Sequence, residues 1–418
     1  MAAADTLPRV TVLCLAASLT GALALAALVR CGGECEVAGE TMEQALTATW
    51  RGDADALRGA LDADPALAEG PVCLPEEGLS GRPSVDFSAL GGFSSLLHVA
   101  ARQGHADIVG ILLAYGTDPD GDNPLGQSPL HLAAMYGHTA AAESLIMGGA
   151  NIDAQARGGY TPLALAAGHG RTEVLKALLA HGAQVDVADG IGWMPLHRAA
   201  SEGHASAARI LLAHGARVDA PTSAGDTALE YALLGGHDAA IRLLLDRGAT
   251  VEDRGHGMTP LTLAVMYADP EHVRLLLDRG ADPNRPDAHG HTALTTAIEY
   301  QGIQIERVFE NASLLLESGA DVHALGTNGD TPLHRAAVRG VPEYTRLLLD
   351  HGSGVDARND WGWTPLFYAA TQHHHELAGI LLERGANPNA VDGSHQTLMS
   401  HVIGDEEMRS LLRRHGAR

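Results

Sequence analysis

Thr331-Pro332-Leu333-His334-Arg335-Ala336-Ala337 is the stretch of the chain that decides its fold. Thr is a favoured N-cap residue and Pro suits the first helical turn, so we expect a helix to begin at Pro332. His334 then lies in that turn, where its ring can bond back to the cap. The leucine and the two alanines give this helix a narrow face that can pack closely against a neighbour.

The same pattern recurs along the chain. Other copies begin at Ser128, Thr161, Met194, Thr259 and Thr364. With three degenerate copies included, the leucines lie at 97, 130, 163, 196, 229, 261, 294, 333 and 366, a spacing of 33 with one step of 32 and one of 39. A Gly stands 21 residues after the first residue of each copy, except Gly319, which is six residues late. A period this constant indicates one structural unit repeated nine times.

Each copy predicts two short helices. A Gly such as Gly137 or Gly203 turns the chain after the first helix, and the second carries an apolar run such as Leu243-Leu244-Leu245. A Gly-Ala pair then ends the second helix, with the Gly in the left-handed conformation. The segment that follows, such as Asp186 to Gly190, projects as a hairpin-like loop. Neither helix can bury its apolar face alone, so neighbouring copies are expected to stack.

This period and the Thr-Pro-Leu-His pattern resemble the ankyrin-repeat family. The resemblance covers residues 95–390 and implies an all-α solenoid of stacked helix-turn-helix pairs with projecting hairpin loops. We assign nine full repeats to residues 93–395, a degenerate capping helix pair plus an insertion loop to 36–92, and a shortened capping repeat to 396–418. A second insertion, of six residues, lies between Gln301 and Asn311.

The N-terminal segment differs from the repeats. Val10 to Val29 contains no charged residue and is flanked by Arg9 and Arg30. About 20 apolar residues can span a bilayer core, and the same run also fits a signal peptide. A buried core helix is the third interpretation, although helices of soluble domains are seldom apolar all round. We therefore expect residues 1–35 to be a signal peptide or a membrane anchor, and the protein to be membrane-anchored or exported, with a composition that suggests a bacterium.

Composition narrows the class of partner. The chain has 28 basic and 51 acidic residues, a net charge of −23, and only 4% aromatic residues. Such a field repels nucleic acid and anionic lipid and attracts basic surfaces. We expect the partner to be a protein, and the charge favours a basic one. We expect no binding of nucleic acid, and membrane contact through residues 10–29 alone. The solenoid is expected to be monomeric.

No catalytic, cofactor or metal site is expected. The sequence has no phosphate-binding loop and no nucleophile motif, so we predict that the protein is not an enzyme. Most of the 23 histidines recur at fixed repeat positions, which indicates a structural role. His373-His374-His375 is less regular, but adjacent helical residues point apart, so we do not expect these three to bind one ion together. Cys31, Cys35 and Cys73 have no closely spaced fourth zinc ligand; in an oxidising compartment two of them can form a disulfide.

The resemblance implies that hairpin tips and first helices line a concave face that takes partners. On this face we consider the residues one and three before each cap residue, and the two after the alanine pair, because neither set has an evident packing role. The partner-binding residues predicted in this way are Leu125, Met135, Tyr136, Tyr160, Ile191, Trp193, Met258, Met266, Tyr267, His289, His291, Tyr300, Trp361 and Trp363. Large aromatic side chains dominate many interfaces. Two alternatives stay open: the tryptophans only cover a neighbouring hairpin, or the groove takes a small ligand in an exported accessory protein.

Overall fold

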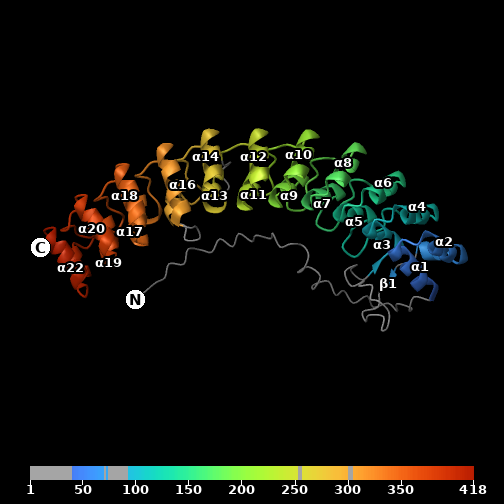
Figure 1. Ribbon diagram of the computed structural model, residues 1–418, viewed down its shortest axis with the longest axis horizontal. Helices are drawn as coiled ribbons and strands as arrows, with labels where there is room; N and C mark the ends of the chain where they lie inside the picture. Colours follow the sequence, from blue (N-terminus) through green and yellow to red (C-terminus); the bar gives the residue numbers. More distant parts are fainter. Residues whose placement is uncertain (1–39, 70–71, 74–92, 253–256, 300–304) are drawn as a thin grey trace. The chain divides into compact units, whose positions relative to one another are not determined.

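The computed structural model describes residues 40–69, 72–73, 93–252, 257–299 and 305–418. The predicted anchor at 10–29, most of the insertion at 71–92, and Tyr300 lie outside these residues. The chain divides into two compact units, one up to Ala228 and one from Leu229 onward. Each unit is a stack of antiparallel helix pairs, with the first helices in one layer and the second helices in another (Figure 1).

The first unit contains the predicted capping pair and four repeats. Its helices are α1 (Glu40–Arg51), α2 (Ala54–Ala63), η1 (Pro65–Ala68), α3 (Leu96–Gln103), α4 (Ala106–Ala114), α5 (Pro129–Tyr136), α6 (Thr139–Met147), α7 (Pro162–Gly168), α8 (Thr172–Ala180), α9 (Pro195–Ser201) and α10 (Ala205–Ala213). Two short strands, β1 (Val72–Cys73) and β2 (Phe93–Ser94), pair antiparallel at the ends of the insertion and were not predicted.

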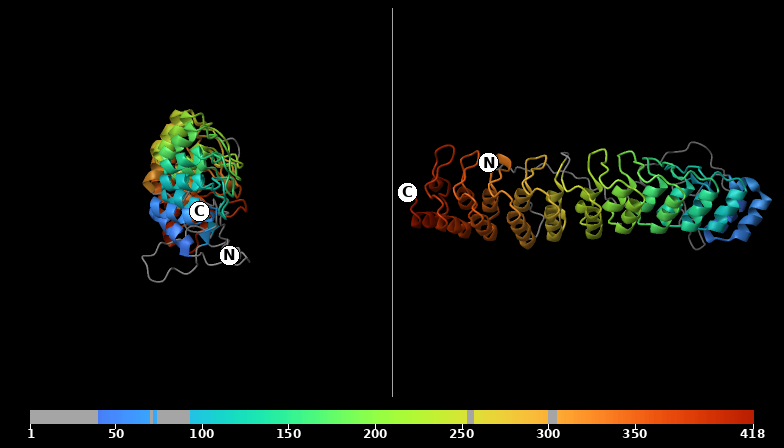
Figure 2. Two further views of the ribbon diagram at one scale, coloured as in Figure 1. Left: turned by 90° about the vertical axis from the view of Figure 1, so that its right-hand side faces the viewer. Right: turned by 90° about the horizontal axis from the view of Figure 1, so that it is seen from above.

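The second unit contains the other five repeats and the C-terminal cap. Its helices are α11 (Ala228–Leu234), which begins at the boundary, α12 (Asp238–Asp246), α13 (Pro260–Tyr267), α14 (Pro270–Asp278), α15 (Ala293–Glu299), α16 (Ile305–Glu317), η3 (Thr327–Gly329), α17 (Pro332–Arg339), α18 (Pro342–Asp350), α19 (Pro365–Thr371), α20 (His375–Glu383), α21 (Leu398–His401) and α22 (Glu406–Arg414). In both units, the loops that connect successive repeats project from the stack on one side (Figure 2).

Alanine and leucine form the core, as the repeat pattern predicts. Leu97, Leu130, Leu163 and the equivalent leucines of the later repeats are at most 1% exposed. Removing apolar surface of this kind from water contributes about 25 cal/mol per Å². Six of the nine repeats have an alanine pair after this leucine, such as Ala133 and Ala134, and each pair is fully buried, which lets first helices approach closely. Stacking therefore supplies the core that no single pair can form.

A histidine in the first turn caps several first helices, as predicted. In α5, the backbone N–H of Ser128 donates to His131 Nδ1 over 3.1 Å, while His131 Nε2 lies 2.9 Å from the Tyr160 carbonyl oxygen of the next repeat. Because Nδ1 accepts, Nε2 carries the proton and the ring is neutral. The same two contacts recur at His98 and His334. His197 accepts the Met194 N–H in the same way, but its Nε2 lies 2.8 Å from the Ala220 carbonyl oxygen, earlier in the following loop. Each ring thus ties one repeat to the next.

This arrangement predicts a stability that depends on pH. Burial lowers the pKa of His98, His131, His197 and His334 below the ordinary value of 6.5. Below pH 6.5 the unfolded chain therefore binds more protons than the folded chain. The stability that is fully present above pH 6.5 is lost as the pH falls from there through the lowered pKa values. We expect the free energy of unfolding in urea to fall with a slope of up to about 1.4 kcal/mol per pH unit for each histidine.

A natural repeat supplies the control for this prediction. In α13 the histidine position holds Thr262, whose hydroxyl lies 2.9 Å from that of Thr259. The variant His131→Thr should therefore flatten the pH slope while the chain stays folded. An unchanged slope in this variant would show that the buried rings do not set the pH dependence.

Candidate functional site

A closed turn shapes eight of the loops that precede a first helix in the described part of the chain. In the fourth repeat the Asp189 N–H donates to the Trp193 carbonyl oxygen over 2.9 Å, and Gly192 between them has a φ of 83°. The same bond, four residues apart, closes the loops that start at Asn123, Ala156, Thr222, Asp287, Gly326, Asn359 and Asp392. The loops are therefore copies of one structure rather than variable connections.

An Asp or Asn side chain fixes the tip in five of these loops. Asp189 Oδ1 accepts hydrogen bonds from the backbone N–H groups of Ile191 and Trp193, at 3.0 and 2.9 Å. Side chains of this type commonly bond to their own backbone two residues further on. We call these residues the tip clamps: Asn123, Asp189, Asp287, Asn359 and Asp392. Four of them hold residues predicted to bind a partner.

Neighbouring tips are also bonded to one another within each unit. In the first unit, Gly190 N–H donates to the Gly158 carbonyl oxygen over 2.8 Å. In the second, Gly393 N–H donates to the Trp361 carbonyl oxygen over 2.7 Å. Such bonds reduce the freedom of each tip, so less conformational entropy is lost when a ligand binds there.

The first unit exposes aliphatic side chains at two clamped tips. Leu125 is 45% exposed and Ile191 is 59% exposed. Tyr136, at the end of α5, is 38% exposed and Met135 before it is half-buried. Arg102 lies over the Tyr136 ring, with its guanidinium carbon 5.2 Å from the ring centroid. Some of the predicted partner-binding residues of this unit thus expose apolar surface.

Trp193 and Tyr160 are half-buried, and Arg198 lies over both rings. The guanidinium carbon of Arg198 is 4.3 Å from the Tyr160 ring centroid and 5.3 Å from that of Trp193. Its Nη2 also pairs with Asp189 Oδ2 at 2.5 Å, and the Asp189 side chain is almost fully buried. A cation over an aromatic ring is favourable by about 0.5–2 kcal/mol. The sequence prediction missed Arg198, which organises both aromatic residues.

In the second unit, Trp361 and Trp363 differ although one clamp, Asn359, holds both. Trp361 is 49% exposed. Trp363 stacks on Phe367 with ring centroids 5.6 Å apart and meets the edge of Tyr368 at 5.1 Å. The prediction that these positions have no packing role is therefore wrong for Trp363. Its ring covers the first helix of its own repeat.

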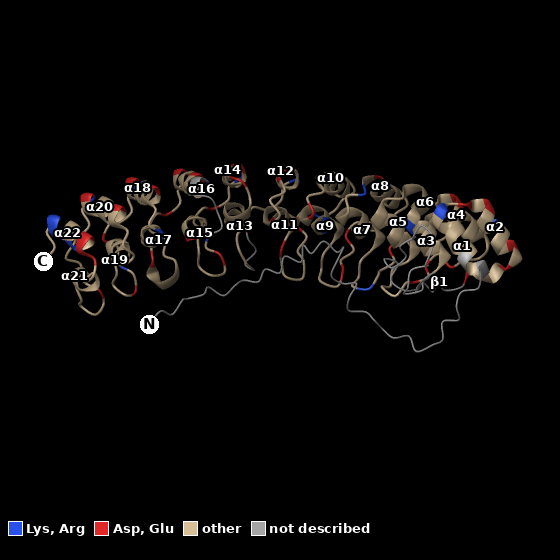
Figure 3. Cartoon of the chain, turned by 60° about the horizontal axis from the view of Figure 1, so that its bottom comes forward, with Lys and Arg blue, Asp and Glu red and all other residues tan. Residues whose placement is uncertain are grey.

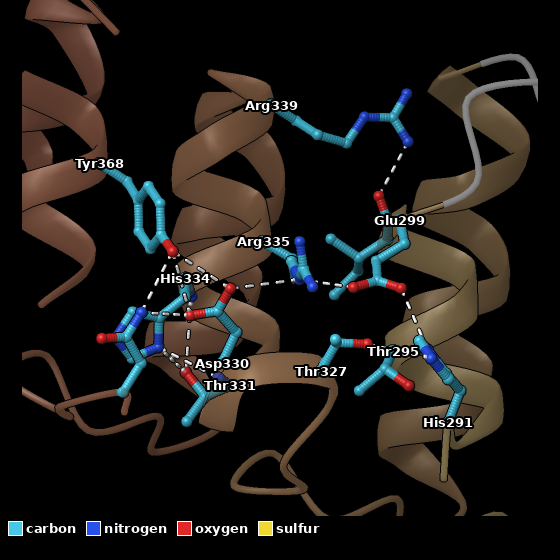
Figure 4. A network of polar contacts seen from close by, with 12 residues as sticks. His291, Thr295, Glu299, Thr327, Asp330, Thr331, His334, Arg335, Arg339 and Tyr368 are labelled. Carbon is cyan, nitrogen blue, oxygen red and sulfur yellow. Dashed lines mark hydrogen bonds and ion pairs between the residues drawn. The ribbon is translucent and has the colours of Figure 1, made fainter. Parts of the chain in front are cut away.

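His291 belongs to a buried polar network of the second unit (Figure 4). Its Nδ1 lies 3.1 Å from Glu299, and Glu299 lies 2.5 Å from Arg335. The Glu299 carboxylate raises the pKa of His291 above its ordinary value. These contacts hold His291 inside the network rather than at a free surface.

The same network continues into the ninth repeat. Arg335 lies 3.5 Å from Asp330, which accepts a hydrogen bond from Asn359 Nδ2 over 2.7 Å. The Tyr368 hydroxyl lies within hydrogen-bond distance of the same carboxylate, and burial raises the Tyr368 pKa. The tip clamp of Trp361 is therefore anchored in buried polar side chains, as buried polar groups generally require.

The other predicted residues have mixed exposure. His289 is exposed, whereas Met258, Met266 and Tyr267 are half-buried. The sequence did carry a signal for the tip clamps that we missed: Asn or Asp stands seven residues before the repeat leucine at 123, 189, 287 and 359. Among the described residues, no helix is long and apolar enough to cross a membrane.

Comparison with known proteins agrees with this architecture. A family model described as ankyrin repeats (3 copies) matches residues 97–189, 184–255, 250–324 and 304–392. No curated protein matches the chain in a sequence search. The family matches cover most of the chain and coincide with the stacked helix pairs. The chain is a member of the ankyrin-repeat family.

Proposed function

We propose that this protein binds a partner protein through the hairpin tips and first helices of its ankyrin repeats. Ankyrin repeats generally mediate protein–protein interaction. The observation that carries the proposal is Trp361, a large side chain 49% exposed on a tip whose backbone is clamped by Asn359. Rigid, exposed aromatic residues of this kind are typical anchors of interfaces. Leu125 and Ile191 present the equivalent tip position in the first unit.

The charge of the repeats supports a basic partner. Acidic residues lie on second helices such as α18 and α20 and in several loops (Figure 3). Together with the net charge of −23, this favours association with a basic protein and disfavours nucleic acid. We propose that the solenoid acts as a monomeric scaffold without catalytic activity or cofactor.

Binding of a small ligand is the second candidate function, and the arrangement of the tips disfavours it. A small-molecule site is typically concave and encloses most of its ligand. The open hollow beside Gly170, Gly203 and His204 is lined by small residues of two turns. In the first unit the exposed members of the predicted set, Leu125 and Ile191, instead lie on separate loop tips.

The domain division remains part of the proposal. We propose residues 36–92 as cap and insertion, 93–395 as the repeats and 396–418 as the C-terminal cap. We also propose that residues 1–35 anchor or export the protein, because 10–29 is long and apolar enough to span a bilayer. Membrane fractionation of the full chain tests this point, since a wholly cytosolic protein would contradict it.

Affinity capture with the full chain, followed by mass spectrometry, tests the binding function. We expect a protein recovered with the wild-type chain to be depleted with the Ile191→Ala/Trp361→Ala variant, which alters one exposed tip in each unit. The Ile403→Ala variant is the control, because Ile403 is exposed but lies next to α22, away from the tips. Recovery of the same proteins in equal amount by all three chains would contradict the proposal.

A further inference from the structure

Two histidines and one aspartate converge between the ninth repeat and the C-terminal cap. His373 Nδ1 lies 2.6 Å from Asp405 Oδ2, and His375 Nε2 lies 2.8 Å from the same oxygen. These three atoms lie within 4.8 Å of one another. The other carboxylate oxygen, Oδ1, accepts the Met408 N–H at the start of α22. Asp405 therefore has a fixed position, and its Oδ2 faces the two rings.

The three consecutive histidines do not lie on one helix, as the sequence interpretation assumed. α20 begins at His375, so the two preceding histidines lie before the helix. His374 precedes it as the N-cap and its Nε2 points back to the Val338 carbonyl oxygen at 3.2 Å. His105 and His138 make the same contact with the preceding repeat. His374 is thus a structural histidine, and its two neighbours are not.

His373 occupies a position that six of the other eight repeats give to glycine; the sixth repeat has Ala268 there and the seventh Gln301. The six glycines are Gly104, Gly137, Gly170, Gly203, Gly236 and Gly340, all with positive φ. His373 keeps the same left-handed backbone with a φ of 61°. A residue with a Cβ is disfavoured there by about 1–2 kcal/mol. A histidine in this place therefore destabilises the turn unless its ring has an interaction that compensates.

We propose that His373, His375 and Asp405 bind a divalent transition-metal ion of the Zn²⁺ class. Two imidazole nitrogens and a carboxylate oxygen suit Zn²⁺ and its neighbours, whereas Mg²⁺ and Ca²⁺ prefer oxygen ligands. The carboxylate also offsets part of the charge of the ion. Water completes the coordination, because the three residues supply only three ligands.

The distances of the two nitrogens from Asp405 Oδ2 need only a small adjustment, and the two nitrogens lie within 4.8 Å of each other. With ligand distances of about 2.0–2.2 Å, neighbouring ligand atoms of a tetrahedral ion lie roughly 3.3 Å apart. The His373 and His375 nitrogens would move away from Asp405 Oδ2 by about 0.5–0.7 Å to reach that separation. The His373 side chain is 66% exposed, so its ring has room to move.

The other nitrogen of His375 lies near a carboxylate, at ion-pair distance rather than hydrogen-bond distance. His375 Nδ1 lies 3.7 Å from Glu407. Metal-bound histidines usually direct their second nitrogen to a carboxylate, which orients the ring and raises its basicity. An ion at this site would join the turn before α20 to the start of α22, and so fasten the last helix pair to the ninth repeat.

Titration calorimetry of the full chain with Zn²⁺ tests the proposal. We expect one tight equivalent, a rise in melting temperature with Zn²⁺, and no comparable effect of Mg²⁺. The His373→Gly variant should lose affinity at least about 10-fold while its turn adopts the backbone of Gly340. The His375→Ala variant should lose affinity to a similar extent, and Ala106 and Ala205 hold the equivalent position in other repeats.

His395→Gly is the matched control. His395 also has a φ of 61°, but it is exposed and lies outside the cluster. This variant removes one histidine and the same backbone strain, yet should bind Zn²⁺ as the wild type does. Equal Zn²⁺ affinity in all four chains, or no Zn²⁺-dependent rise in melting temperature of the wild type, would show that the cluster is only an ion-paired contact.

Discussion

The Asp189→Ala variant is expected to lose about 3–5 kcal/mol of unfolding free energy, the cost of breaking a buried ion pair by removing one partner. Asp189 accepts from two backbone N–H groups and pairs with Arg198 at 2.5 Å. Its removal leaves the guanidinium, which is only 14% exposed, without its carboxylate. Urea unfolding measures the loss, and the Trp193 fluorescence should change because the tip is no longer held.

Two further variants separate the contribution of the backbone hydrogen bonds of Asp189 from that of its ion pair. Asp189→Asn should keep both backbone hydrogen bonds, since Asn123 and Asn359 clamp their own tips in this way. It therefore isolates the contribution of the ion pair. Asp186→Ala breaks the pair with the exposed Arg217, which should contribute about 0–1 kcal/mol. A loss in Asp189→Ala no greater than that in Asp186→Ala would contradict the role given to this clamp.

The Leu244→Ala variant is expected to lose about 2–5 kcal/mol, because Leu244 of α12 is fully buried. The cost combines lost apolar burial with the cavity left behind. In a repeat stack each helix pair contacts only its neighbours, so the damage should stay local. Hydrogen exchange should show faster opening around α11 and α12, with less change at the distant termini.

Leu325→Ala serves as the control for this core prediction. Leu325 is exposed in a loop, so its replacement should change stability by no more than about 0.5 kcal/mol. If Leu244→Ala altered exchange only at the termini, nearest-neighbour stacking would be the wrong description of the second unit.

The sequence predicts the fold well because one signal is repeated many times. The leucine spacing, the Thr-Pro start and the Gly-Ala end agree in copy after copy, so a degenerate copy such as that around Leu229 is still recognised by its register. Each local signal also agrees with the stacking that buries it, as is typical of foldable sequences. The histidine caps follow from the same register, and the bonds of His131 and His334 confirm them.

The candidate site is harder to predict, because register gives position but not side-chain direction. Trp361 and Trp363 stand two residues apart in equivalent settings, yet only Trp363 packs on Phe367. The difference depends on the large aromatic residue at 367, where other repeats hold histidine, alanine, glutamate or threonine. Arg198 was missed for a related reason: its partners Tyr160 and Asp189 are far apart in the repeat pattern and meet only after folding.

The turn at His373 shows both what the repeat register can predict and what it cannot. A run of three histidines after a helical pattern suggests continued helix, but the repeat register places His373 at a glycine position. Register would have predicted the left-handed turn. It would not have predicted Asp405, which reaches the rings from the start of the next helix pair.

Partner affinity and unfolding free energy, measured together on Trp361→Ala and Trp363→Ala, test the central claim most directly. We expect Trp361→Ala to weaken partner binding by about 2 kcal/mol or more with stability within about 0.5 kcal/mol of the wild type. Trp363→Ala should instead lose at least about 1 kcal/mol of stability, because its ring packs on Phe367 and Tyr368. Unchanged partner affinity in the folded Trp361→Ala protein would contradict the claim that the clamped tips are the binding surface.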